Sequence, residues 1–332
     1  MIFQIDARNV HEALPAALRA LQVDGVNRPS RNGNVRLFPA PVNTTYYRPT
    51  ERVMFHAERD CNPFFHLYES LWMLAGRRDV KSVAHYVKRM ADYSDDGVVF
   101  HAAYGHRWRH HFGSDQIAKV IAALSKNPND RRCVIGMWDT RVDLGFEGKD
   151  FPCNTTAMFA VNYEGDLDMT VTNRSNDIVW GAYGANAVHF SMLQEYIASS
   201  LGRAVGRYYQ FSNNFHAYDE TRKQVDVLRY NVSNPYISGE VEPFDIMEER
   251  GQAAFDLDLT VYMERGPITG LTTPFFRGVV TPMHYAHQAY KSSCPDRFVI
   301  AKEILLQCRA SDWRKAATEW LERRERKANA QR

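Results

Sequence analysis

A thiol and a guanidinium stand about one β-hairpin apart near the middle of the chain, at Cys153 and Arg174. Residues 155–161 are apolar and rich in strand-forming types, residues 164–166 (Glu-Gly-Asp) are typical of a turn, and residues 167–172 alternate like a returning strand. Such a hairpin brings the two side chains together, and we expect the positive charge to lower the pKa of the thiol. The pattern predicts a nucleophilic cysteine that faces an anionic substrate.

Other kinds of cysteine and metal chemistry have less support. A lone cysteine is often a small core residue, but Ser175 and Asp177 follow the arginine closely and add polar groups to the region. His106, His110 and His111 cluster without a metal-binding spacing, so no metal site is expected. No Cys-x-x-Cys pair occurs, and an odd number of cysteines argues against a disulfide scaffold. The five cysteines are Cys61, Cys133, Cys153, Cys294 and Cys308.

Short motifs flank the cysteine on both sides. Upstream stand Tyr-Glu-Ser-Leu-Trp-Met-Leu-Ala-Gly at 68–76, Tyr-Gly-His-Arg-Trp-Arg at 104–109 and Asp-Arg-Arg at 130–132; downstream stand Arg-Ser-Asn-Asp at 174–177 and His-Ala-Tyr at 216–218. Their order and spacing resemble the thymidylate synthase and pyrimidine-nucleotide hydroxymethylase superfamily, from about residue 31 to about residue 218. The resemblance implies an α+β, thymidylate synthase-like fold, with a mixed sheet packed with helices, a dimer formed through the sheet and an extra C-terminal helical extension.

The resemblance also implies a reaction. A thiolate from Cys153 adds to C6 of a pyrimidine, and C5 then becomes nucleophilic enough to attack a one-carbon donor, 5,10-methylenetetrahydrofolate. Glu69 corresponds to the general acid–base of the family, and its apolar neighbours suit proton transfer near neutral pH. A glutamate on the polar face of an amphipathic helix is the alternative. Tyr104 and Asp177 complete the implied catalytic set.

A pyrimidine nucleoside monophosphate is the implied substrate. Its phosphate needs positive donors, and by resemblance Arg131 and Arg132 reach it from the second subunit of a homodimer, although adjacent arginines can equally be surface charge. Asn186 would read the base, although counting forward from Arg174 places Ala185 there. The implied nucleotide-binding residues are Arg31, Arg131, Arg132, Arg174, Ser175, Asn186, His216 and Tyr218, of which the last two hold the ribose. The implied folate-binding residues are Asp177, Gly181 and Trp72; for Asp177, helix capping is the alternative.

The fate of the transferred carbon separates two activities. Hydride transfer gives a methyl group, whereas water gives a hydroxymethyl group. Asn154 stands where synthases usually carry histidine, residues 87–90 lack the shielding tryptophans, and residues 328–332 are not a short apolar tail. These departures favour the hydroxymethyl product. Thymidylate synthase activity on dUMP and a non-catalytic nucleotide-binding relative are the alternatives, and the sequence leaves dCMP, dUMP and CMP open.

Composition excludes several other classes. A net charge of +2 gives no general case for nucleic-acid binding, and the apolar runs are too short to span a membrane. Residues 1–7 lack a signal-peptide pattern, so we expect a cytoplasmic protein, in a bacterial cytosol or that of a phage-infected host. We expect a thymidylate synthase-like catalytic domain over residues 1–230, and a C-terminal part over 231–332 that completes it and adds the helical extension.

The elements that position these residues follow from periodicity and turn signals. Helices are predicted over 10–23, 63–75, 79–90, 116–126, 190–201 and from 216 toward 230; strands over 133–138 and 208–213; and a surface loop over 27–34. The segment 312–332 is expected to be a surface helix whose charged end, from Glu322, is frayed and solvated, with a basic nucleic-acid arm as the alternative.

Overall fold

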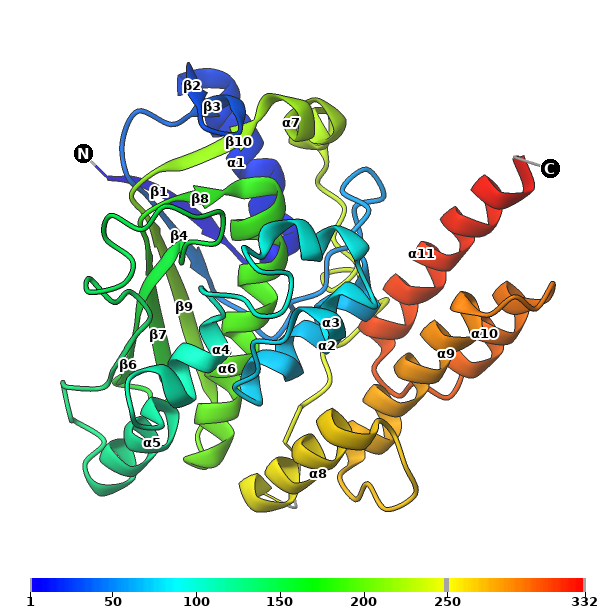
Figure 1. Cartoon of the computed structure of the whole chain (residues 1–332). Helices are drawn as coiled ribbons and strands as arrows, with labels where there is room; N and C mark the ends of the chain where they lie inside the picture. The colour runs from blue at the N-terminus through cyan, green and yellow to red at the C-terminus, as the bar shows by residue number, and fades with distance from the viewer. Residues whose placement is uncertain (1, 248–250, 331–332) are drawn as a thin grey trace.

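The computed structural model describes residues 2–247 and 251–330 and has an α+β architecture (Figure 1). Its main sheet is mixed and six-stranded, in the order β1-β4-β9-β7-β6-β5. The strands are β1 (Phe3–Ala7), β4 (Val42–Tyr46), β5 (Val134–Gly136), β6 (Asn154–Val161), β7 (Leu167–Asn173) and β9 (Val205–Ser212). The pairs β1–β4 and β7–β9 run parallel, and the other neighbours run antiparallel. The predicted fold class is confirmed.

The hairpin that carries the cysteine forms as predicted. Strands β6 and β7 pair from Asn154↔Asn173 to Val161↔Leu167, and Gly165 in the turn has φ +92°, in the left-handed region that favours glycine. Cys153 directly precedes one strand and Arg174 directly follows the other. The Arg174 N–H donates to the Cys153 carbonyl at 2.9 Å, so the hairpin places the two residues side by side.

Helix α6 (Asn186–Ser200) lies at the centre, between the main sheet and α2 (Figure 1). The described helix begins four residues earlier than the predicted one, and almost all of its side chains are buried. Helix α2 (Pro63–Leu74) begins as expected, with proline in the first turn and the Asn62 side chain accepting from the Phe65 N–H. The predicted helices α1 (Val10–Asp24) and α5 (Gln116–Lys126) are also present.

The surface-loop prediction for residues 27–34 is wrong. These residues form most of β2 (Val26–Ser30) and the start of β3 (Gly33–Leu37), and only the turn between them is loop. They belong to a second sheet of four strands, in the order β2-β3-β10-β8. Every side chain of β2 is exposed, so the strand has none of the apolar alternation by which a strand is recognised.

Two helix predictions also need correction. Residues 215–218 form strand β10 (Phe215–Tyr218), which pairs with β3 and with β8 (Asn176–Asp177), and helix α7 (Asp219–Val225) begins only afterwards. The single helix predicted over 79–90 is divided into α3 (Val80–Ala84) and the 3₁₀ helix η1 (Lys88–Tyr93). Between them Val87 has an extended backbone, with φ −137° and ψ 100°, which interrupts the helix, and the neighbouring Tyr86 stacks on Tyr68 with ring centroids 4.5 Å apart.

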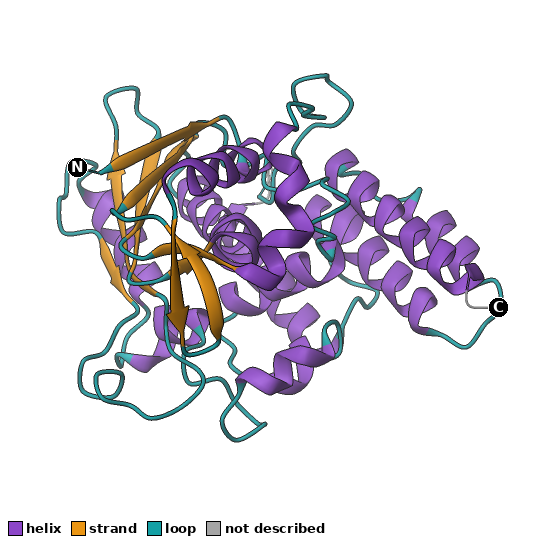
Figure 2. Ribbon diagram, turned by 90° about the horizontal axis from the view of Figure 1, so that it is seen from above, coloured by secondary structure: helices purple, strands orange, loops and turns teal. Residues whose placement is uncertain are grey.

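Four further helices lie to one side of the sheet (Figures 1 and 2). They are α8 (Gly251–Arg265), α9 (Thr281–Lys291), α10 (Arg297–Leu305) and α11 (Ser311–Ala330). The apolar face predicted for α11 is buried, and Trp320 packs on Phe64 of α2. None of the helices in the described ranges is both long and apolar enough to cross a membrane.

The fraying predicted from Glu322 is wrong, although residues 326, 327, 329 and 330 are exposed as expected. Helix α11 continues to Ala330, and three of its charged residues, Arg323, Arg324 and Glu325, have partners. Arg323 Nε donates to Asp60 Oδ1 at 2.9 Å, Arg324 bonds the same oxygen, and Lys302 Nζ lies 2.8 Å from a Glu325 oxygen. These contacts attach the helix to the residues just before α2 and to α10.

Candidate active site

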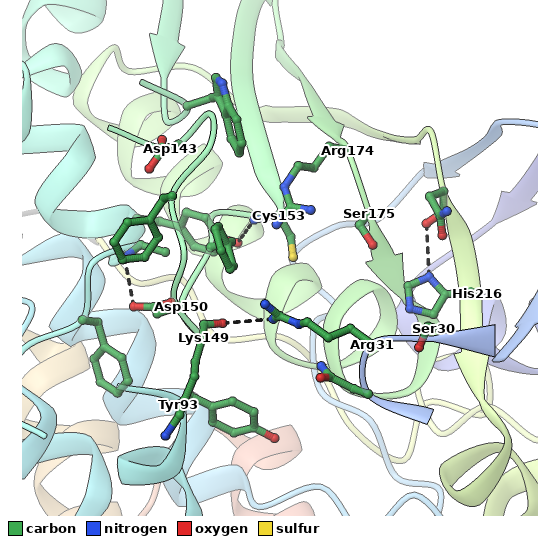
Figure 3. A pocket seen from close by; sticks show the side chains of 18 of the residues that line it. Ser30, Arg31, Tyr93, Asp143, Lys149, Asp150, Cys153, Arg174, Ser175 and His216 are labelled. Carbon is green, nitrogen blue, oxygen red and sulfur yellow. Dashed lines mark hydrogen bonds between the residues drawn. The ribbon is translucent and has the colours of Figure 1, made fainter. Parts of the chain in front are cut away.

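A cavity of about 930 Å³ opens between the second sheet, α2 and the loop that precedes β6 (Figure 3). This volume is at the upper end for small-molecule sites, so it can take a ligand of nucleotide size together with a second molecule. Nine residues predicted from the sequence line it. They are Arg31, Glu69, Trp72, Tyr104, Cys153, Arg174, Ser175, His216 and Tyr218.

The backbone of the cysteine is held by a phenol. The N–H groups of Cys153 and Asn154 donate to the Tyr104 hydroxyl at 3.0 and 3.3 Å. Burial raises the pKa of Tyr104 well above its ordinary value, so the group is a neutral phenol. Tyr104 therefore fixes the start of β6, and with it the direction of the thiol.

The expected lowering of the thiol pKa is not what the structure shows. Burial raises the pKa of Cys153 above its ordinary value, and the positive charge of Arg174 opposes this shift without overcoming it. Asp150 and Asp177 act in the same direction as burial. The protonated thiol is therefore favoured near neutral pH, and a reaction that used the thiolate would have to generate it.

Arg174 and Arg31 converge on the same end of the cavity (Figure 3). Arg174 Nε donates to the Pro152 carbonyl at 2.9 Å, which leaves both terminal nitrogens without a hydrogen bond to any described residue. Arg31 reaches over from the β2–β3 turn and donates to the Gly148 carbonyl at 3.0 Å. With the Ser175 hydroxyl beside them, the two guanidinium groups suit a phosphate.

Replacing Arg174 with alanine should raise the KM for the nucleotide about 10- to 100-fold, because a hydrogen bond to a charged group is worth roughly 1.5–3 kcal/mol. Lysine at this position should give an intermediate KM, since it keeps the charge but not the planar fork. Steady-state kinetics with the nucleotide and with its 5′-dephosphorylated nucleoside provide the test. If the variant loses as much activity on the nucleoside, Arg174 does not act on the phosphate.

The opposite wall of the cavity comes from α2. Glu69 is buried, and its Oε2 lies 2.9 Å from Nε2 of His189 on α6, so it does not face solvent as the alternative interpretation required. Trp72 donates from its indole nitrogen to Asp79 at 3.2 Å and packs edge-to-face on Phe100, another residue of the lining. The α2 wall thus combines one carboxylate with flat apolar surface.

Asn186 lies behind the cavity lining, in a chain of buried amides. Asn154 Nδ2 donates to Asn186 Oδ1 at 3.2 Å, Asn186 Nδ2 donates to Asn176 Oδ1 at 3.3 Å, and Asn176 Nδ2 donates to Gln210 Oε1 at 3.3 Å. The chain ends at the Ala182 carbonyl, 3.4 Å from Gln210 Nε2. A carbonyl can only accept, so Gln210 must point its nitrogen at Ala182 and its oxygen at the next amide. The same reasoning then fixes the orientation of each amide along the chain. Asn154 Oδ1, at the other end, has no partner among the described residues.

Besides Asn186, four predicted site residues do not line the cavity. Asp177 caps the π-helical segment η3 (Ile178–Ala185), accepting from the N–H groups of Val179 and Trp180 at 3.2 and 3.1 Å. A Cβ at Gly181 would lie 3.2 Å from Asn176 Oδ1 and 3.4 Å from Asn186 Nδ2, so glycine leaves room for the amide chain. The two arginines, Arg131 and Arg132, are exposed, and Arg132 pairs with Asp130 at 2.7 Å.

The loop over residues 139–152 supplies lining residues that the sequence did not reveal. Asp150 points a carboxylate toward the cavity and accepts from the Ala102 N–H at 3.0 Å, and burial raises its pKa. Met90 and Tyr93 contribute from η1. Single residues of these types belong to no motif, and nothing in the local sequence shows that they face a cavity.

The chain belongs to the thymidylate synthase family, whose sequence model matches residues 18–261. Among its relatives is the deoxyuridylate hydroxymethyltransferase of Pseudomonas phage M6, 52% identical over 330 residues, which span 96% of this chain and 94% of the relative. The enzyme of the same name from Bacillus phage SP01 is 40% identical over 54% of this chain and 49% of its own length. A thymidylate synthase of Streptococcus pyogenes is 38% identical over 34% of this chain and 41% of its own length.

Proposed function

We propose that this protein transfers a one-carbon unit to C5 of dUMP and releases the 5-hydroxymethyl nucleotide. The observation that carries the proposal is that one cavity is lined by the Cys153 thiol, by the Arg174 guanidinium, which suits a phosphate, and by the Glu69 carboxylate. The similarity to a deoxyuridylate hydroxymethyltransferase over nearly the whole chain supports uracil as the base and the hydroxymethyl group as the product. Reductive methylation of dUMP, as in a thymidylate synthase, is the alternative.

The chain's own residues would act in sequence. Cys153 sulfur bonds to C6, and the ring electrons move to C5, which bonds to the incoming carbon. Loss of the C5 proton, with cleavage of the bond between the new carbon and the nitrogen of its donor, leaves an exocyclic methylene and releases the donor as a protonated amine. Water then adds its oxygen to this methylene carbon and gives its proton to a carboxylate, for which Glu69 is the candidate. The ring expels the Cys153 thiolate as the C5–C6 double bond re-forms, so atoms and charge balance.

The one-carbon donor implied by the family is 5,10-methylenetetrahydrofolate. The cavity fits it, because the flat side chains of Trp72, Phe100 and Tyr93, with Met90, line the region beside Glu69 and offer surface for a planar ring system. When bound, 5,10-methylenetetrahydrofolate would supply the carbon at the oxidation level of formaldehyde. The residues beside Glu69 would hold and orient it, although Asp177 and Gly181 could contribute only from behind the lining.

Turnover should proceed without formation of dihydrofolate, because water capture leaves tetrahydrofolate unoxidised. Asn154 Oδ1, a buried acceptor beside the nucleophile with no described partner, supports a bound water in this region, since buried polar atoms are nearly always hydrogen-bonded. The measurement combines the absorbance of dihydrofolate with the mass of the product, and a thymidylate synthase serves as the positive control. A methylated product with stoichiometric dihydrofolate would establish the alternative activity.

The proposal includes a homodimer formed through the outer face of the main sheet. Met158 on β6 is 37% exposed and Val134 on β5 is 47% exposed, and burial of such side chains favours association. Arg131 and Arg132 lie just before β5, where they could reach a cavity of a partner subunit. The phage origin of the relatives supports a place in the cytosol of an infected bacterium.

A further inference from the structure

Three buried polar atoms where α2 meets α6 lack well-aligned hydrogen bonds to any residue that the structure describes. They are Glu69 Oε2 and both ring nitrogens of His189. The Glu69 and His189 side chains are only 7% and 1% exposed, and Oε2 lies 2.9 Å from Nε2. The 2.9 Å separation is within hydrogen-bond distance, so a small rotation of either side chain would align a ring N–H of His189 with the carboxylate, and buried polar atoms are nearly always paired.

Only one of the two residues, Glu69 and His189, lines the cavity. Glu69 is part of the lining, whereas His189 stands behind it. His189 lies three residues after Asn186 on α6, so the two share a face of that helix, and Asn186 bonds the amide that follows Cys153. The α6 face that carries His189 therefore also carries the residue that contacts the Asn154 amide, next to Cys153.

We propose that His189 is a positioning residue for hydration of the exocyclic methylene. Its Nε2–H donates to Glu69 and holds the carboxylate so that the other oxygen faces the attacking water. The water oxygen bonds to the methylene carbon, Glu69 receives the water proton, and the ring expels the Cys153 thiolate. This inference rests on the proposed function, because it assigns a role only in the step that water completes.

Neighbouring groups do not offer the same contact. His66, on α2, is also buried, and burial lowers its pKa well below the ordinary value, with the charge of Arg59 acting in the same direction. Neither His66 nor Arg59 makes a hydrogen bond or ion pair to Glu69 among the described residues. Asp150 lies in the cavity but is held by the Ala102 N–H, on the loop side.

The test replaces His189 with leucine and with glutamine. Leucine should lower kcat for the hydroxymethyl product about 10- to 100-fold with a nucleotide KM within about twofold, since a well-placed general base contributes 10²–10⁴. Glutamine carries an N–H donor at nearly the position of Nε2 and should restore most of the rate. His66→Leu is the matched control, because it also puts leucine in place of a buried histidine, and it should keep near-native kcat.

A second experiment measures how often water, and not an added thiol, reacts with the methylene intermediate. An added thiol, 2-mercaptoethanol, competes with water: its sulfur bonds to the methylene carbon, its proton goes to solvent, and the ring again expels Cys153. The ratio of thioether to hydroxymethyl product, resolved by mass, should rise at least about tenfold in His189→Leu and fall back in His189→Gln. A merely structural defect would lower both products together and would overturn the inference, as would a native ratio and kcat. Failure of the wild-type protein to make any hydroxymethyl product would instead overturn the proposed function.

Discussion

Replacing Cys153 with serine should abolish product formation, by a factor of about 10⁴ or more, while dUMP binds almost as tightly as to the native protein. Serine has nearly the same size, so the hydrogen bonds from the backbone to Tyr104 persist. The hydroxyl ionises far less readily than a thiol and adds poorly to C6. Product mass and equilibrium binding of dUMP measure the two effects separately.

The matched control for this variant is Cys294→Ser. Cys294 is half-buried, as Cys153 is, but lies between α9 and α10, away from the cavity, so native activity is expected. A Cys153→Ser protein that keeps a substantial rate would show that no covalent bond from this residue is needed. The proposed mechanism would then be wrong even if the cavity binds dUMP.

Mixing two inactive variants should restore activity if the cavities are shared between subunits. One chain carries Cys153→Ser and the other Arg132→Ala. After exchange, half of the dimers are hybrids, and each has one site with both lesions and one with neither, so about a quarter of native activity is expected. The assay is best run at low dUMP, where loss of a phosphate contact has its largest effect.

Exchange is verified with two different affinity tags. Hybrid dimers without recovered activity would show that Arg132 does not act across the interface. Within the described chain this arginine is exposed and paired only with Asp130, so its place in a site depends on a second subunit. Each parent variant, assayed alone after the same treatment, provides the baseline.

The parts of the structure that follow from local sequence were predicted best. The hairpin from Asn154 to Asn173 and helix α2 have their own turn and capping signals, which do not depend on distant residues. Strand β2 was missed because its exposed polar side chains carry no alternation; only pairing with β3 shows that it is a strand. The boundary expected near residue 230 stays a prediction.

The sequence predicted which residues line the cavity better than it predicted their pKa values and contacts. Arg31, Cys153 and Tyr218 come together in the cavity from distant positions, as the resemblance implied. The raised pKa of the thiol could not be predicted, because burial depends on the complete fold, whereas the proximity of Arg174 follows from the hairpin alone. His189 was missed for a similar reason: its contact with Glu69 joins two helices.

Sheet pairing has a consequence for the order in which the chain can assemble. Strands β6 and β7 are sequence neighbours and can pair quickly, whereas β4 pairs Val42 with Ser212 and β3 pairs Leu37 with His216. Closing such long loops is slow. The Cys153 hairpin can therefore form while the Arg31 side of the cavity still awaits β10. During synthesis the Cys153 hairpin would be in place before the rest of the cavity, which would close only when about two-thirds of the chain has left the ribosome.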